Sequence, residues 1–288
     1  MDWLNAVIQG LLLGGLYALF ATGLSLMFGV MRIVNLAHGD LAIVASFLAL
    51  AMVSGTGLPI WVVLVVTVPL FAALGYLTQR VLLQRSLSAG PLATLLVTFG
   101  LSIVIQNLLL EIFSADTETL DGGSFDTGAF EITEQISLPY LSLATFVLAV
   151  VVLVAIQLFL ARTGLGRMLR ASSDDRDTAT LVGADSRHVY GVATAIAFGT
   201  VALAGLMMAM RSSFDPSMGP SRLLFAFEAV VIGGLGSLWG TLIGGLVLGL
   251  TQSIGAQIDP ALTILAGHLV FLAVLAFRPQ GLIPGRAS

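Results

Sequence analysis

Nine long apolar segments constrain this chain more than any other feature of its sequence. A helix needs about 20 apolar residues to cross the hydrocarbon core of a bilayer, and a chain in lipid must satisfy its own backbone hydrogen bonds. We therefore predict an all-α, polytopic transmembrane bundle with about eight or nine membrane segments, folded as a single domain over residues 1–288. The segments fall at about 5–30, 36–54, 59–79, 90–113, 138–161, 189–210, 223–236, 239–258 and 260–277.

The charged residues are too few to cover a water-exposed surface. They make up 10% of the chain, against about 25% in an ordinary soluble domain. All twelve basic residues are arginine, and cysteine is absent. A phosphate-binding loop of the GxxxxGK[ST] type needs lysine, so this chain cannot supply one. Disulfides and cysteine metal sites are excluded as well.

The distribution of arginine predicts how the chain is oriented in the membrane. Five arginines crowd residues 162–188, and two more close the chain, whereas residues 86–161 hold seven acids and no arginine. Cytoplasmic loops carry the excess of basic residues. We therefore expect 162–188 and the C-terminus in the cytoplasm, with the acidic loop 114–137 and the N-terminus outside.

Two segments differ from plain membrane spans. Residues 33–40 place Asn35, His38 and Asp40 between two apolar runs, and 223–236 has only about 14 residues and ends in a glycine-rich stretch. Interrupted segments in both halves of a transporter indicate broken helices around a midplane pathway. A tight cytoplasmic turn and a tilted helix are the alternatives. The candidate pathway residues are Asn35, His38, Asp40, Phe225, Glu228, Gly233, Gly234 and Gly236.

Glycines recur every four residues near the C-terminal end, a spacing that lets two helices approach closely. We expect packing inside the chain, with packing against a second subunit as the alternative. The candidate packing residues are Gly240, Gly244, Gly245 and Gly249.

The arginine-rich stretch predicts a short amphipathic helix between two long spans. Ser172 or Ser173 can cap this helix, Asp174 and Asp175 can occupy its first turn, and Gly183 can end it. Such a helix suits docking to a partner that moves the flanking spans. The alternative is a solvated loop whose arginines only set the orientation.

Four motifs in order resemble the LivH-type permeases of branched-chain amino-acid ABC importers. They are GLYALFATGLSLMFGVMRIVNLAHGDLAI, GRMLRASSDDRDTATLVGA, AVVIGGLGSLWGTLIGGLVLGL and FRPQGLIPGR, and the resemblance covers essentially the whole chain. It departs where many members have lysine near Phe225, small residues near Glu228 and proline at Trp239. With these departures, urea, short amides and other amino acids stay open as substrates.

The resemblance implies a permease of the bacterial inner membrane that moves branched-chain or related amino acids by alternating access. It implies a second permease, either a LivM-like homologue or a second copy, together with two ATPase subunits and a periplasmic binding protein. ATP and Mg²⁺ would be bound by the ATPases, so this chain itself would be no enzyme and would hold no cofactor. The ATPase-coupling residues implied are Gly166, Arg167, Arg170, Ala171, Asp174, Asp175, Ala179, Leu181 and Gly183.

Other functions stay open at this point. An ABC permease for urea or short amides fits the same motifs. An ion-coupled secondary transporter would use buried acids such as Asp40, Glu228 and Glu111. An intramembrane hydrolase would need Ser237 beside a histidine base, and a metal site at His38 and Asp40 has too few ligands.

Overall fold

The computed structural model describes residues 2–122, 128–133, 136–181 and 185–285. Helices dominate, and the two short strands form a hairpin. The elements are α1 (Asp2–Met31), α2 (His38–Thr56), α3 (Ile60–Thr78), the π-helix η1 (Gln79–Leu83), α4 (Gln84–Ala89), α5 (Pro91–Phe113), β1 (Ala129–Thr133), β2 (Ile136–Pro139), α7 (Tyr140–Arg162), α8 (Gly164–Asp174), α9 (Arg176–Leu181), α10 (Ser186–Arg211), α11 (Gly219–Gly233), α12 (Leu238–Ile258) and α13 (Leu262–Phe277).

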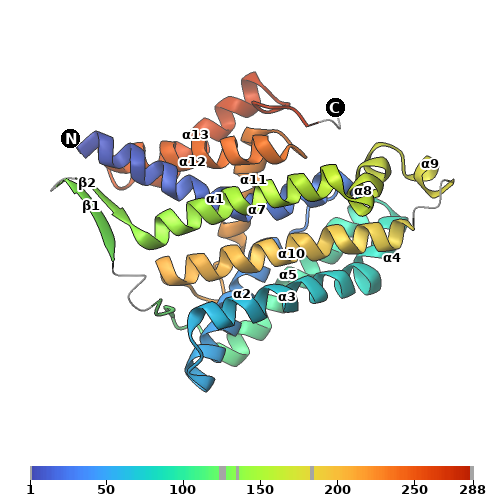
Figure 1. Cartoon of the computed structure of the whole chain (residues 1–288), viewed down its shortest axis with the longest axis horizontal. Helices are drawn as coiled ribbons and strands as arrows, with labels where there is room; N and C mark the ends of the chain where they lie inside the picture. Colours follow the sequence, from blue (N-terminus) through green and yellow to red (C-terminus); the bar gives the residue numbers. More distant parts are fainter. Residues whose placement is uncertain (1, 123–127, 134–135, 182–184, 286–288) are drawn as a thin grey trace.

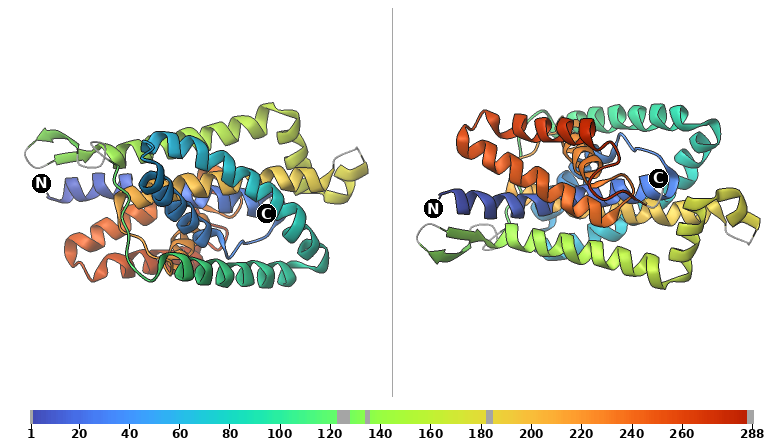
Figure 2. Two further views of the ribbon diagram at one scale, coloured as in Figure 1. Left: turned by 90° about the horizontal axis from the view of Figure 1, so that it is seen from below. Right: turned by 90° about the horizontal axis from the view of Figure 1, so that it is seen from above.

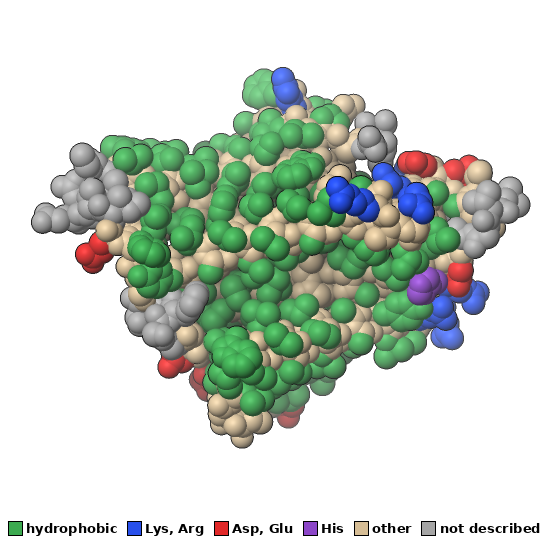
Figure 3. Space-filling view, in the orientation of Figure 1, with side chains coloured by type: hydrophobic (Ala, Val, Ile, Leu, Met, Phe, Trp, Pro, Cys, Tyr) green, Lys and Arg blue, Asp and Glu red, His purple; other side chains and the backbone are tan. Residues whose placement is uncertain are grey.

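The predicted helical membrane bundle is confirmed. Within the described residues, seven helices are long and apolar enough to cross a membrane, and α13 is a shorter apolar helix. Apolar side chains cover the middle of the face in Figure 3, and the arginines visible there gather mainly near α8. With α11 and α13 both short, a count of eight or nine spans stays a prediction.

Two helices, α1 and α10, form the centre of the bundle. In each of them 83% of the most apolar window is buried, against 22% in α3, α5 and α7. α1 packs along α12, and α10 packs along α3. The helices that follow them, α2 and α11, also pack against each other. The two halves of the chain are therefore interlocked, because each central helix is covered mainly by a helix of the other half.

Glycine allows α1 and α12 to pack at close range. A Cβ built on Gly14 would lie 2.6 Å from Leu246 Cα, and one built on Gly245 would lie 2.7 Å from the backbone nitrogen of Ala18. Real Cβ contacts are longer than this, so neither position has room for a side chain. Gly249 meets α1 one turn further along, whereas Gly240 and Gly244 face α11. The glycine stripe is used inside the chain.

The two ends of the bundle carry different connections (Figure 1). The start of α1 and the β1–β2 hairpin lie at one end, and α8 and α9 lie at the other. The hairpin pairs Phe130 with Leu138 and Glu131 with Ser137. The sequence predicts only a loop at 114–137, because its glycine and acidic residues obscure the short alternating pattern of the strands.

Candidate functional site

The chain is interrupted between α1 and α2 at residues 32–37. The Asn35 side chain accepts a hydrogen bond from the Ala37 backbone N–H at 3.1 Å, and the Asn35 carbonyl accepts one from His38 at 3.1 Å. His38 is fully buried, and its Nε2 lies 2.9 Å from the carbonyl oxygen of Phe20. Since Phe20 lies well inside α1, α2 begins within the bundle and not at its surface.

A second interruption, at residues 212–218, separates α10 from α11, and the starts of α2 and α11 meet. Gly39 lies against the Gly219 carbonyl and the Leu223 backbone nitrogen, so a Cβ at Gly39 would overlap α11. Asp40, in the first turn of α2, lies against Gly219 as well. The first turns of the two helices therefore meet at Asp40.

Two buried acidic side chains each form a hydrogen bond with a helix that is largely exposed on the outside of the bundle. Asp40 Oδ1 accepts a hydrogen bond from Gln106 Nε2 of α5 at 3.0 Å, and Glu228 Oε1 pairs with His268 Nδ1 of α13. Asp40 and Glu228 are each only 1% exposed. Their second oxygens, Asp40 Oδ2 and Glu228 Oε2, are buried without a hydrogen-bond partner among the described residues. A carboxylate at this depth is costly unless something compensates it, so both acids are functional candidates.

Further polar and aromatic groups surround Glu228. The Tyr17 hydroxyl donates to Gln252 Oε1, and Gln252 Nε2 is buried without a partner among the described residues. The Phe225 ring lies 5.3 Å from Tyr17 and 6.4 Å from His268 between centroids. The structure thus joins groups from α1, α11, α12 and α13 into one cluster.

Sequence reasoning missed Tyr17, Gln106 and Gln252 as members of these clusters. Each of the three is a polar side chain in an otherwise apolar span, and the same criterion identified Glu228 from the sequence. His268 of α13 is the partner of Glu228.

The glycines predicted beside Glu228 lie at the opposite end of α11 from Asp40. Gly234 and Gly236 have φ of 116° and 78°, which only glycine adopts readily. Here the chain reverses, and the tail folds back so that Ile283 N–H donates to the Gly233 carbonyl at 2.9 Å. The structure therefore places Gly233, Gly234 and Gly236 in a turn that anchors the tail.

The arginine-rich loop contains two helices, α8 and α9, where one was predicted. The prediction that Ser172 or Ser173 caps the helix is wrong. Ser172 and Ser173 lie in the last turn of α8, where they cannot cap a following helix. Asp175 instead has an extended backbone (φ −150°, ψ 109°) that ends α8. Its carboxylate accepts hydrogen bonds from the Thr178 N–H at 3.1 Å and from the Thr178 hydroxyl at 2.6 Å, so it caps α9. Gly183 lies outside the described residues.

α8 is attached to two long helices. Gly166 packs against the backbone of Leu160 in α7, and Leu169 and Ser172 are also buried. On the other side, the Ser173 hydroxyl donates to the Gly29 carbonyl of α1. In α9, Ala179 is buried, and the structure describes the backbone of Leu181 but not its side chain. Movement of α8 would therefore be transmitted directly to α7 and to the end of α1.

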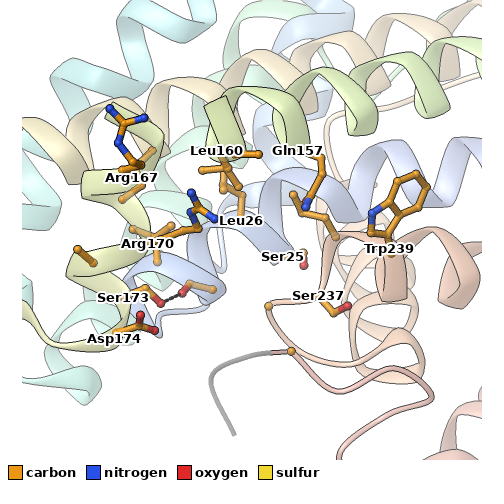
Figure 4. Close-up of a pocket in the computed structure, with 18 of the residues that line it drawn as sticks. Ser25, Leu26, Gln157, Leu160, Arg167, Arg170, Ser173, Asp174, Ser237 and Trp239 are labelled. Carbon is orange, nitrogen blue, oxygen red and sulfur yellow. Dashed lines mark hydrogen bonds between the residues drawn. The ribbon is translucent and has the colours of Figure 1, made fainter. Parts of the chain in front are cut away.

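A cavity of about 640 Å³ lies beside α8 (Figure 4). α1 contributes Ser25 and Leu26, α7 contributes Gln157 and Leu160, and the first turn of α12 contributes Trp239. α8 closes the cavity at one end, and the tail borders it. The lining residues from α8 are Leu169, Ser173 and four predicted coupling residues, Arg167, Arg170, Ala171 and Asp174.

The structure gives the hydrolase and metal interpretations no site among the described residues. Ser237 Oγ accepts a hydrogen bond from Gly240 N–H at 3.1 Å and so caps α12. His38 and His268 bond to Phe20 and Glu228 instead. No group of three or more potential metal-ligating side chains occurs in the described part of the chain.

Comparison with known proteins gives consistent results along the whole chain. The profile of the family described as "Branched-chain amino acid transport system / permease component" matches residues 6–277. The permease protein BraD of Pseudomonas aeruginosa is 29% identical over 98% of this chain and 95% of its own length. The permease protein LivH of Escherichia coli K12 is 26% identical over the same shares. LivM of Escherichia coli K12 is 25% identical over 93% of this chain and 68% of its own length.

A solved structure shares the fold. The PsaBC complex of Streptococcus pneumoniae with Fab contains a chain that superposes with a TM-score of 0.53 at 15% identity. The superposition covers 96% of this chain and 93% of that one. At this identity the likeness describes the fold alone.

Proposed function

The chain belongs to the family of branched-chain amino-acid transport permeases, and on this premise we propose that it is the membrane-spanning subunit of an ATP-driven importer. The observation that carries the proposal is the family match over residues 6–277, on a chain that folds as a polytopic helical bundle. The curated relatives BraD and LivH are high-affinity branched-chain amino-acid permease proteins. We propose branched-chain or closely related amino acids as the substrate.

The partners follow from what this chain lacks and from its relatives. Without lysine it has no Walker A loop, so two separate ATPase subunits would bind ATP and Mg²⁺. LivH and LivM are both similar to this chain, which supports a second permease, either a LivM-like homologue or a second copy. A periplasmic binding protein would deliver the amino acid from outside. The chain itself would be no enzyme and would need no cofactor.

We place α8, α9 and the C-terminal tail on the cytoplasmic side of the bacterial inner membrane. Arg162, Arg167 and Arg170 lie at that end of the bundle, and Glu131 lies on the hairpin at the other end. This distribution supports the orientation through the excess of basic residues in cytoplasmic loops. The start of α1 shares the hairpin's end, so the N-terminus would lie outside.

The amino acid would pass along the side of the molecule that carries α5 and α13. Figure 2 shows these two helices on one side and α7 on the opposite side. On that side the buried acids Asp40 and Glu228 each keep one oxygen without a hydrogen-bond partner among the described residues. Such an oxygen can accept a hydrogen bond from the ammonium group of a passing amino acid. Alternating access would open this path to each side of the membrane in turn.

The coupling element would be α8 and α9. ATP binding would close the ATPase dimer against this pair, and the contacts of α8 would carry the movement into the long helices. Ser173 connects α8 to Gly29 of α1, and Gly166 connects it to α7. Asp175 would hold α9 in register for the ATPase.

Uptake by whole cells tests this function. Cells without their own branched-chain importers would express the chain with its candidate partner subunits, and uptake of labelled leucine would be followed. We expect uptake that is lost when either the ATPases or the binding protein is left out. Uptake by this chain alone that a protonophore abolishes would establish an ion-coupled transporter instead. Competition by urea, short amides and other amino acids would define the substrate.

The absence of native cysteine allows a direct test of the coupling element. A single cysteine at Thr180, which is exposed in α9, should form a crosslink with cysteines in the docking cleft of the ATPase. A cysteine at Glu131, exposed on the hairpin, is the matched control and should not form one. The reverse pattern of crosslinks would overturn both the orientation and the coupling assignment.

A further inference from the structure

The cavity beside α8 is a groove between helices that opens on the side of the molecule away from α5 and α13. α1 forms its floor, and α7 and α12, which both pack against α1, form its walls. α7 lies on the side opposite α5 and α13 (Figure 2). The proposed amino-acid path therefore does not use this groove.

The walls of the groove continue into exposed apolar side chains. On α7, Val151 and Leu158 are 55% and 43% exposed, and on α12, Trp239 and Ile243 are 46% and 37% exposed. Both helices are membrane-spanning candidates, so these exposed side chains are placed where lipid can reach them. Exposed tryptophan is typical of the level at which lipid headgroups begin. The groove thus lies where acyl chains meet headgroups.

The end of the groove at α8 is polar and has a net positive charge. Arg167 and Arg170 of α8 line it with a single acid, Asp174. The N-terminal turn of α12 forms part of the wall of the groove. A helix N-terminus attracts anions. Figure 4 shows the Arg170 side chain lying beside Leu26 and the Gln157 side chain pointing from α7 toward α1. Arg170 therefore lies next to the apolar floor.

Ser25 provides an independent sign of a ligand. It is 0% exposed, it lines the groove, and its hydroxyl has no hydrogen-bond partner among the described residues. A buried hydroxyl without a partner costs free energy that a ligand oxygen can recover. The groove therefore offers an unused hydrogen-bonding group between its basic end and its apolar walls.

We propose that this groove binds one anionic glycerophospholipid of the inner leaflet. The phosphate would lie between Arg167, Arg170 and the first turn of α12, and an ester oxygen of the glycerol unit would accept the hydrogen bond of Ser25. One acyl chain would follow the exposed side chains of α7 and α12. Ser173 connects α8 to α1 beside the groove. A lipid bound there would therefore hold α8 in the position from which it couples to the ATPase.

Native mass spectrometry of the assembled complex tests the proposal. The complex would be exchanged into detergent with phosphatidylglycerol or with phosphatidylcholine of the same acyl chains. We expect one tightly retained phosphatidylglycerol per copy of this chain and no such retention of phosphatidylcholine. Equal retention of the two lipids would overturn the assignment of the basic end. Binding of glycerol phosphate or inorganic phosphate with the affinity of the whole lipid would overturn the assignment of the acyl-chain groove.

Substitutions locate the site. Each basic residue near an anionic membrane surface contributes about a fivefold preference for the anionic lipid. The double variant Arg167→Gln/Arg170→Gln should therefore weaken phosphatidylglycerol retention by roughly 30-fold. Arg162→Gln removes one positive charge at the end of α7 next to α8, outside the lining of the groove, and is the control for general surface charge.

Ser25→Leu tests the same groove if the double variant unfolds. Ser25→Leu leaves every charge in place and fills the floor of the groove, so it should also weaken phosphatidylglycerol retention. Full retention by a folded Ser25→Leu chain would overturn the proposal. An equal loss in the Arg162→Gln control would overturn it as well, because the effect would then be general surface charge.

Discussion

The close packing of α1 against α12 predicts a measurable cost for one added methyl group. In Gly245→Ala, the new Cβ would lie 2.7 Å from the Ala18 nitrogen and 2.8 Å from the Gly14 carbonyl oxygen. Non-bonded heavy atoms prefer separations of about 3.5–4.0 Å. Because these neighbours are backbone atoms, no side-chain rotation can relieve the overlap, and the helices must separate locally by roughly 1 Å.

The expected magnitude combines two effects of opposite sign. Overpacking of a well-packed interior costs about 1–3 kcal/mol. Alanine also favours a helix over glycine by about 1 kcal/mol, which conceals part of that cost. Gly100→Ala is the matched control, because a Cβ at Gly100, within α5, would meet nothing within 4 Å. The difference between the two variants removes the helix preference and leaves about 1–3 kcal/mol.

Reversible unfolding of the isolated chain in mixed micelles measures this difference. Both variants and the unmodified chain would be titrated with the same denaturing detergent, and the free energies of unfolding would be compared. Gly245→Ala should be less stable than Gly100→Ala by about 1–3 kcal/mol. Free energies of unfolding that agree within about 0.5 kcal/mol would refute the close packing of α1 on α12.

Other predictions concern the polar clusters and the coupling element. Glu228→Gln keeps the size but replaces one acceptor oxygen with an amide NH2 group, so labelled-substrate uptake should fall at least tenfold at unchanged expression; normal uptake would make Glu228 a packing residue. His268→Ala leaves the buried Glu228 without its partner, so the free energy of unfolding should fall by about 1–3 kcal/mol, and a fall below about 0.5 kcal/mol would contradict the pairing. Asp175→Ala removes the cap of α9 at a cost of about 1 kcal/mol, so uptake should fall while the ATPases still hydrolyse ATP; undiminished uptake would speak against a coupling role. Tyr17→Phe removes the hydrogen bond to Gln252 and should lower the free energy of unfolding by about 1 kcal/mol in the same micelle titration, whereas an unchanged value would contradict that bond.

The fold class and most of its helices could be predicted because the bilayer imposes a length on every apolar run. Each of the nine predicted segments corresponds to one helix in the structure, with ends that differ by a few residues. The largest shift is at α11, which begins at Gly219 and not at 223, because Pro220 fits the first turn of a helix. The cap of α9 was misplaced because Ser172, Ser173, Asp174 and Asp175 are all good capping residues, and only the backbone conformation distinguishes them.

The pairings between helices could not be predicted from the sequence. Glu228 was recognised as an acid in a membrane segment, yet nothing in the sequence joins it to His268, which is 40 residues away. The same holds for Asp40 and Gln106, which are 66 residues apart. Both pairs depend on the way the two halves of the chain interlock. A glycine stripe indicates that a helix packs closely but does not name the helix it packs against.

The proposed function requires this chain to carry an amino acid across the membrane while partner subunits hydrolyse ATP. The most direct test is substrate uptake into proteoliposomes that hold this chain with its candidate second permease, ATPases and binding protein, with and without ATP on the ATPase side. We expect uptake that requires ATP and every one of the partners. Uptake by this chain alone, driven by an ion gradient and indifferent to ATP, would contradict it.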